Sequence, residues 1–109
     1  MHAEHQTFLD ALHAKRRLSV RFFSKKEKRE LVKTCAPMDF GPLRGALDAT
    51  PRYQFWDLLG KRKPLNIAVL EEDIREITPV DGTFEPEEII TWTFKPGAWS
   101  VARDWGAFS

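Results

Sequence analysis

The first forty residues change from a helical spacing of apolar positions to an alternating one. Between 3 and 16, apolar residues recur every three or four positions, which places them on one helical face, and cations crowd the last turn. From 18 to 24, apolar and polar residues alternate with the period of a strand. After a charged turn a second strand-like run covers 29–38, and it should stop at or just after Pro37 because proline cannot donate to a ladder. The pattern predicts a helix ending near Arg16 and then a β-hairpin.

Glycine and proline punctuate the chain between 39 and 50, which predicts a loop. Three more strand-like runs follow, and then a short helix whose first turn would hold Pro86 and several glutamates. The five expected strands lie at 18–24, 29–38, 52–58, 65–69 and 74–78, and the helix lies within 84–92. Five strands this short bury a core best by curling into a small barrel. The predicted fold class is therefore mainly β (α+β).

The length of 109 residues allows one domain with one core. We expect a barrel domain over 1–91 and an aromatic tail over 92–109. Aromatic residues this dense in a tail usually dock, either on the chain's own barrel, which we favour, or on a partner. The candidate docking residues are Trp92, Trp99, Trp105 and Phe108.

Several kinds of site and location are disfavoured by the composition. No apolar run approaches the roughly 20 residues that span a bilayer, and the N-terminus does not resemble a signal peptide, so we expect a cytoplasmic protein without a membrane partner. Cys35 is the only cysteine and is interpreted as a small apolar strand residue. The three histidines, His2, His5 and His13, lack the companions of a metal site.

No phosphate loop, nucleophile elbow or Ser-His-Asp arrangement occurs in the sequence. The carboxylate clusters at 71–73 and 85–88 lack an apolar frame that would raise a pKa. We therefore expect a protein that is not an enzyme and that uses neither a metal nor another cofactor.

The net charge of +1 hides a division along the chain. Residues 1–70 contain 14 Lys and Arg against 7 Asp and Glu, while residues 71–109 contain 3 against 9. The densest cationic stretch is 15–33, where Arg21 and Lys33 could sit on neighbouring strands of the hairpin. Such a surface attracts phosphates, although a lysine-rich hairpin turn that serves solubility and edge protection explains the cluster about as well.

The strand at 52–58 combines this charge with aromatic residues. Alternation predicts that Tyr53 and Phe55 serve the core and that Arg52, Gln54 and Trp56 share the opposite face. Aromatic side chains beside cations are the means by which small barrels bind single strands. The candidate ligand-binding residues are Arg21, Lys33, Arg52, Tyr53, Gln54, Trp56, Lys61, Arg62 and Lys63.

The order of the elements and several residues resemble the WYL domain of bacteria. Lys33 stands four positions before Pro37, where that family prefers a cation, and Tyr53 is the residue that remains of the family's Trp-Tyr-Leu run. Ile74 matches an isoleucine that closes the family's arginine-rich stretch, although 65–74 contains no arginine. Phe84 and Pro86 match a trailing "F-x-P".

This resemblance implies an SH3-type or Sm-like β-barrel and a role in regulation. WYL domains commonly accompany DNA-reading domains of transcription regulators, where they sense nucleotides or single-stranded nucleic acid or mediate dimerisation. The resemblance therefore implies a non-catalytic sensor module for a phosphate-bearing ligand, with a separate DNA-binding protein as partner. The alternative is a homodimerisation or protein-interaction module without a ligand of its own.

Overall fold

The helical face at the N-terminus forms α1 (His5–Ala14), which buries Phe8, Ala11 and Leu12. The computed structural model describes residues 2–109. The helix ends earlier than expected because Lys15 takes a left-handed conformation, with φ of 54°, and its N–H returns to the carbonyl of Leu12. Arg16 is consequently the first residue of a strand.

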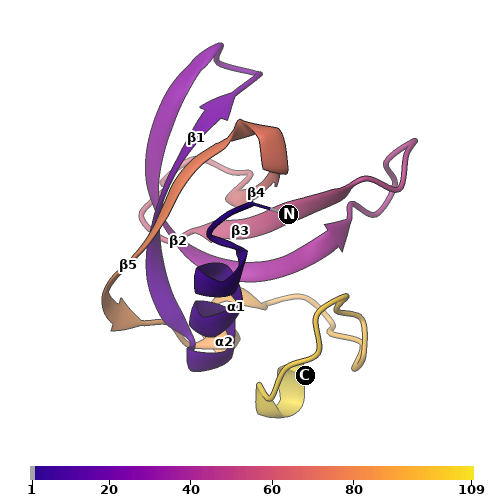
Figure 1. The fold of residues 1–109 in the computed structure, drawn as a ribbon. Coiled ribbons are helices and arrows are strands. Elements are labelled where there is room, and N and C mark those ends of the chain that lie inside the picture. Colours follow the sequence, from indigo (N-terminus) through magenta and orange to yellow (C-terminus); the bar gives the residue numbers. More distant parts are fainter. Residues whose placement is uncertain (1) are drawn as a thin grey trace.

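Five antiparallel strands follow α1 and form one sheet (Figure 1). They are β1 (Arg16–Ser24), β2 (Arg29–Pro42), β3 (Pro51–Asp57), β4 (Asn66–Leu70) and β5 (Ile74–Thr83). Their order across the sheet is β4-β3-β2-β1-β5, and the 3-10 turn η1 (Glu71–Asp73) joins β4 directly to β5. The mainly β, α+β fold class is confirmed. No ladder joins β4 to β5, so the sheet is open and closure into a barrel is not confirmed.

The second strand is longer than the sequence pattern predicted. It runs through Pro37 to Pro42, so the expected loop begins at residue 43 rather than at 39. The last residue of β2 that pairs with β1 is Cys35, and beyond it β2 pairs with β3 alone. A proline is tolerated there because one side of the strand has no partner to bond. A register shift between Pro37 and Asp39 further relaxes the ladder.

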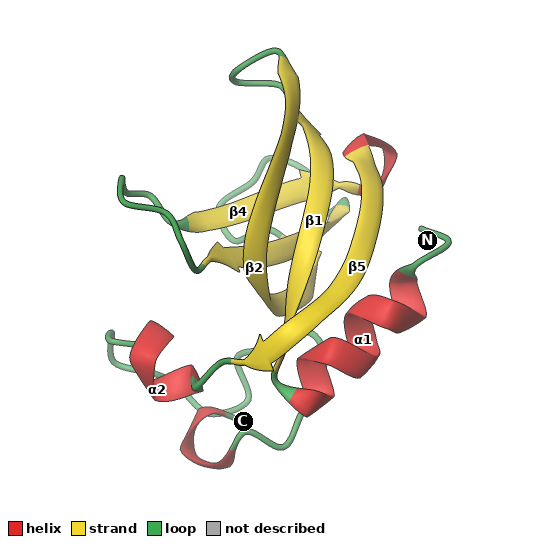
Figure 2. Cartoon of the chain, turned by 90° about the vertical axis from the view of Figure 1, so that its left-hand side faces the viewer, coloured by secondary structure: helices red, strands yellow, loops and turns green. Residues whose placement is uncertain are grey.

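The fifth strand is also longer than predicted, because it continues through Pro79 to Thr83. It lies at the edge of the sheet, where a proline costs no bond to a second neighbour. Figure 2 shows α1 beside this strand. The segment at the start of α1 binds β5 directly: Ile77 N–H donates to the Glu4 carboxylate at 2.9 Å, and His2 Nε2 donates to Ile74 O at 3.2 Å.

The core lies between α1 and the inner face of the curled sheet. Tyr53 and Phe55 point into it, as strand alternation predicted, and Cys35 is also buried there. The largest fully buried side chains are Tyr53, Phe8, Phe55, Leu12, Leu18 and Ile77. The Tyr53 hydroxyl forms its hydrogen bonds with the N-terminal segment. It accepts the backbone N–H of His2 at 3.2 Å and lies 2.8 Å from His5 Nδ1.

After β5 the chain forms the short helix α2 (Pro86–Ile89) and then an extended tail that ends in η2 (Gly106–Phe108). The tail packs on the chain's own fold. Trp105 is buried, packs against Phe84, and donates its indole N–H to the carbonyl of Leu12 at 2.9 Å. Within residues 2–109, no helix is both long and apolar enough to cross a bilayer.

Candidate binding groove

The outer face of β3 and β4 carries the floor of a groove. Gln54 and Trp56 point outward from β3, because Tyr53, Phe55 and Asp57 between and beyond them are buried. On β4, Ala68 lies opposite Gln54 and Asn66 lies opposite Trp56. These pairs make a short amphipathic surface beside the core.

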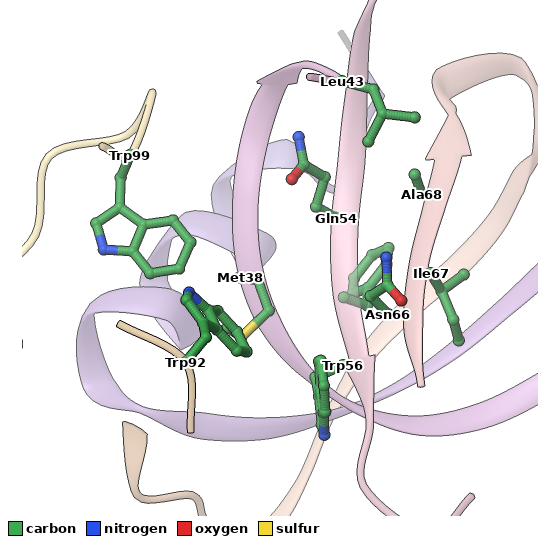
Figure 3. Close-up of a pocket in the computed structure, with 10 residues that line it drawn as sticks. Met38, Leu43, Gln54, Trp56, Asn66, Ile67, Ala68, Trp92 and Trp99 are labelled. Atoms are coloured by element: carbon green, nitrogen blue, oxygen red, sulfur yellow. The ribbon is translucent and has the colours of Figure 1, made fainter. Parts of the chain in front are cut away.

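Two other segments wall this floor and leave a groove of about 410 Å³ (Figure 3). Met38 and Leu43 come from the end of β2 and the loop after it, and Trp92 and Trp99 come from the tail. The rings of Trp92 and Trp56 have centroids 6.0 Å apart and are tilted by 38°. Trp92 is 48% exposed, so this indole is available to a ligand.

The tail reaches the groove because a buried ion pair anchors it. The Asp39 carboxylate accepts the backbone N–H groups of Ser100 and Val101, each at 2.9 Å, and Arg103 Nη2 at 3.2 Å. The side chains of Asp39 and Arg103 are 8% and 0% exposed. Gly41 is required where the tail crosses β2, because a Cβ at this position would collide with the Ser100 side chain.

The Arg103 guanidinium lies between two indoles of the tail, 4.0 Å from the ring centroid of Trp99 and 4.3 Å from that of Trp105. It also donates to the carbonyls of Met38 and Val101. Burial lowers the pKa of Arg103 to about 10, and the Asp39 charge opposes this shift, so the side chain stays cationic at neutral pH. The ion pair therefore fixes Trp99 at the wall of the groove.

Polar groups in the groove remain available for hydrogen bonding. Gln54 donates one N–H to Gly41 O at 3.3 Å, which leaves its carbonyl oxygen as an acceptor. Across residues 2–109, the side-chain amide of Asn66 and the indole N–H groups of Trp56 and Trp92 have no hydrogen-bond partner in the protein. The groove thus combines stacking surfaces with both donors and acceptors.

Cations occupy the two loops that flank the groove. Arg44 follows Leu43 in the loop before β3, and Lys61, Arg62 and Lys63 lie in the loop that joins Trp56 to Asn66. All four are exposed, and none forms an ion pair within the described part of the chain. A fifth exposed cation, Lys95, lines an adjoining cavity together with Arg44. The loops at the two ends of the groove, which we call its rim, therefore carry unpaired cations, whereas Glu85 and Glu88 line a second cavity beside Trp56.

The structure brings together only some of the residues that the sequence nominated. Gln54 and Trp56 line the groove, and the three cations of 61–63 lie in the loop that joins its lining residues Trp56 and Asn66. Arg52 shares their face but pairs with Asp48 at 3.5 Å. Tyr53 is fully buried in the core and cannot meet a ligand in the groove.

The two cations nominated on the β1–β2 hairpin lie apart from the groove and from each other. Arg21 pairs with Glu30 at 3.0 Å, while Lys33 pairs with Asp57 at 3.4 Å. They are on neighbouring strands, as predicted, but Lys33 lies opposite Val20 and Arg21 lies opposite Val32, so alternation puts the two on opposite faces.

The tail aromatics have different surroundings. Trp92 and Trp99 wall the groove, Trp105 belongs to the core, and Phe108 packs edge-on against Phe94. Sequence reasoning missed the contributions of Met38, Leu43, Arg44, Asn66 and Ala68. The alternation of 65–69 could have indicated Asn66 and Ala68, because it places them on the face opposite Ile67 and Val69.

Comparison of the chain with protein-family models, with curated proteins and with solved structures found no match. Membership of the WYL family therefore stays a prediction. Among residues 2–109, no group of three His, Cys, Asp or Glu side chains is arranged to hold a metal ion.

The buried thiol of Cys35 gives a first testable expectation. Burial, reinforced by the Asp57 carboxylate and opposed by Lys33, raises the pKa of Cys35 to about 12. Because only the thiolate is nucleophilic, an aromatic disulfide reagent at pH 8 should react about a thousandfold more slowly with the folded protein than with the chain in denaturant. Rapid reaction of the folded protein, followed by absorbance, would show that this site opens readily.

Proposed function

We propose that the protein is a non-catalytic module that binds single-stranded nucleic acid in the outer-face groove. The observation that carries the proposal is the half-exposed Trp92, which lies against Trp56 in a groove whose floor strand, β3, is flanked by two loops with unpaired cations. Bases would stack on the two indoles, and phosphates would lie along the cations of 61–63 and Arg44. Aromatic stacking combined with a positive rim binds single strands with little sequence preference.

Further features support this ligand class. A single-stranded base exposes both hydrogen-bonding edges, and the amides of Gln54 and Asn66 offer donors and acceptors at the floor of the groove. The cationic rim favours a polyanion over a neutral apolar ligand of similar size. The resemblance to WYL domains points to the same ligand class and to a role in regulation through a separate DNA-binding protein.

Binding should be measured by fluorescence anisotropy with a labelled oligonucleotide of about 12 nucleotides at low salt. We expect Trp92→Ala to weaken binding about 10- to 100-fold, because loss of one stacking platform costs that much per base. Lys61→Glu and Arg62→Glu should also weaken binding, and they should reduce the salt dependence of the affinity since fewer phosphate contacts remain.

A matched control is Lys26→Glu, which reverses an exposed charge in the β1–β2 turn, at a residue that lines the cleft beside β4 and not the groove. It should change affinity much less than Lys61→Glu. A mononucleotide and a duplex serve as competing ligands: the single strand should bind more tightly than either. Equal loss of binding in Lys26→Glu and Lys61→Glu would indicate non-specific attraction to net charge and would refute the groove as the site.

A further inference from the structure

The open sheet has two free edges, and they are protected to different degrees. The edge at β5 is covered in part by the N-terminal segment, since Glu4 and His2 bind the backbone of Ile77 and Ile74. This strand also contains Pro79 and charged residues, which discourage pairing with another chain. The five residues of β4, in contrast, include neither a proline nor a charged residue.

The exposed edge of β4 is uncharged and contains no proline. Its sequence is Asn66-Ile67-Ala68-Val69-Leu70. A cleft of about 360 Å³ borders residues 67–70, and its other wall includes Phe22, Phe23 and Ser24 at the end of β1. The charged residues that line this cleft, Lys25, Lys26, Arg52 and Asp73, lie outside β4. The β1–β2 hairpin therefore leaves space beside this strand. An uncharged edge of this kind is a template for pairing with another strand.

The hydrogen bonds to β3 show which backbone groups of β4 face outward. Asp57 N–H donates to Leu65 O at 2.8 Å, one step before the β3–β4 ladder begins with Trp56 opposite Asn66. In an antiparallel pair, hydrogen-bonded and non-hydrogen-bonded positions alternate. The N–H and C=O groups of Asn66, Ala68 and Leu70 consequently point away from β3, toward the free edge.

The segments before and after β4 carry opposite charges. Two β4 strands paired antiparallel would therefore bring the cations of one copy near the acids of the other. Lys61, Arg62 and Lys63 lie before the strand, and Glu71, Glu72 and Asp73 lie directly after it. We propose that a second copy of this chain is the partner of this edge, with β4 pairing antiparallel to β4 about a two-fold axis through Ala68. The three outward-facing residues then pair only with each other: Ala68 with its counterpart, and Asn66 with Leu70.

This register brings opposite charges together at both ends of the interface. The loop of 61–63 of one copy lies beside η1 (Glu71–Asp73) of the other at each end of the paired strands. Asp73 already pairs with Lys25 of its own chain at 3.3 Å, whereas Glu72 is exposed and its carboxylate forms no ion pair within residues 2–109. Glu72 is therefore the acid best able to meet Lys63 of the second copy. Because Asn66 and Ala68 also line the binding groove, the two grooves would adjoin across the axis.

The backbone part of this proposal is tested by Ala68→Pro, with Ala68→Thr as the matched variant that keeps the N–H. Multi-angle light scattering and sedimentation from about 1 to 100 μM, without nucleic acid, should show the unaltered protein changing from monomer to dimer. The proline removes an N–H that β3 does not use, and should weaken the dimer about a hundredfold. Ala68→Thr should dimerise like the unaltered protein.

The charge part is tested by Glu72→Lys, which should weaken the dimer about tenfold because like charges face each other at both ends. The double variant Lys63→Glu/Glu72→Lys should restore it. Glu87→Lys, an equal charge change on α2, should have no effect. These variants decide the matter even if Ala68→Pro fails to fold. A monomer at every concentration, oligomers that grow beyond the dimer, or a dimer insensitive to both Ala68→Pro and Glu72→Lys would overturn the proposal.

Discussion

Arg103→Met is expected to lower the free energy of unfolding by about 3–5 kcal/mol, because it leaves the Asp39 carboxylate buried without its cation. The variant also loses the guanidinium contacts with Trp99 and Trp105 and the hydrogen bonds to the carbonyls of Met38 and Val101. Methionine roughly fills the volume but cannot replace these polar contacts. Urea unfolding followed by far-ultraviolet circular dichroism measures the loss.

The matched control is Arg62→Met, which removes an exposed arginine that forms no ion pair among the described residues. Its effect on the free energy of unfolding should stay within about 0.5 kcal/mol. The double variant Asp39→Asn/Arg103→Met should recover part of the stability, since no unpaired charge remains buried. If Arg103→Met and Arg62→Met were equally stable, the ion pair would not hold the tail in solution.

Trp105→Ala should destabilise the protein by about 3–5 kcal/mol, the usual cost of removing a large buried aromatic side chain. Its ring packs against Phe84 and Trp99, and its indole N–H donates a hydrogen bond to the carbonyl of Leu12 in the last turn of α1. The tail would lose its contact with both α1 and the segment before α2. Thermal unfolding with calorimetry should therefore show a clear decrease in the melting temperature.

Trp92→Ala removes the same side chain from a site that is half exposed, and should cost less than about 1 kcal/mol. The contrast between these variants distinguishes a tryptophan that supports the core from one that serves a ligand. Comparable destabilisation by Trp92→Ala would mean that its contact with Trp56 is structural. In that case, weaker nucleic-acid binding by this variant would no longer identify the groove.

Much of the fold follows from local patterns in the sequence. The helical spacing before residue 17 and the alternation in Tyr53 and Phe55 correctly predicted which side chains are buried. The extensions of β2 and β5 were missed because both cross a proline, and whether a proline ends a strand depends on whether a neighbouring strand requires its N–H. That neighbour is a property of the sheet and is not visible in the local sequence.

The candidate site was predictable only in part, for a similar reason. The sequence nominated Gln54 and Trp56 correctly because strand alternation alone places them on the outer face of β3. Met38, Leu43 and Trp92 reach the groove through long-range contacts, so the sequence could not place them beside these two residues. The cationic hairpin was the strongest signal in the composition, yet Arg21 and several neighbouring cations are paired with carboxylates in the structure. Charge density does not reveal which cations remain free for a ligand.

The most direct measurement of the central claim is the response of the four indole N–H signals in a ¹H–¹⁵N NMR spectrum during titration with a single-stranded oligonucleotide at low salt. We predict large shifts for Trp56 and Trp92, whose rings line the groove, and little change for Trp105, which donates to Leu12 O inside the core. Unchanged Trp56 and Trp92 signals at saturating oligonucleotide, or shifts confined to the β1–β2 hairpin, would contradict binding in the groove.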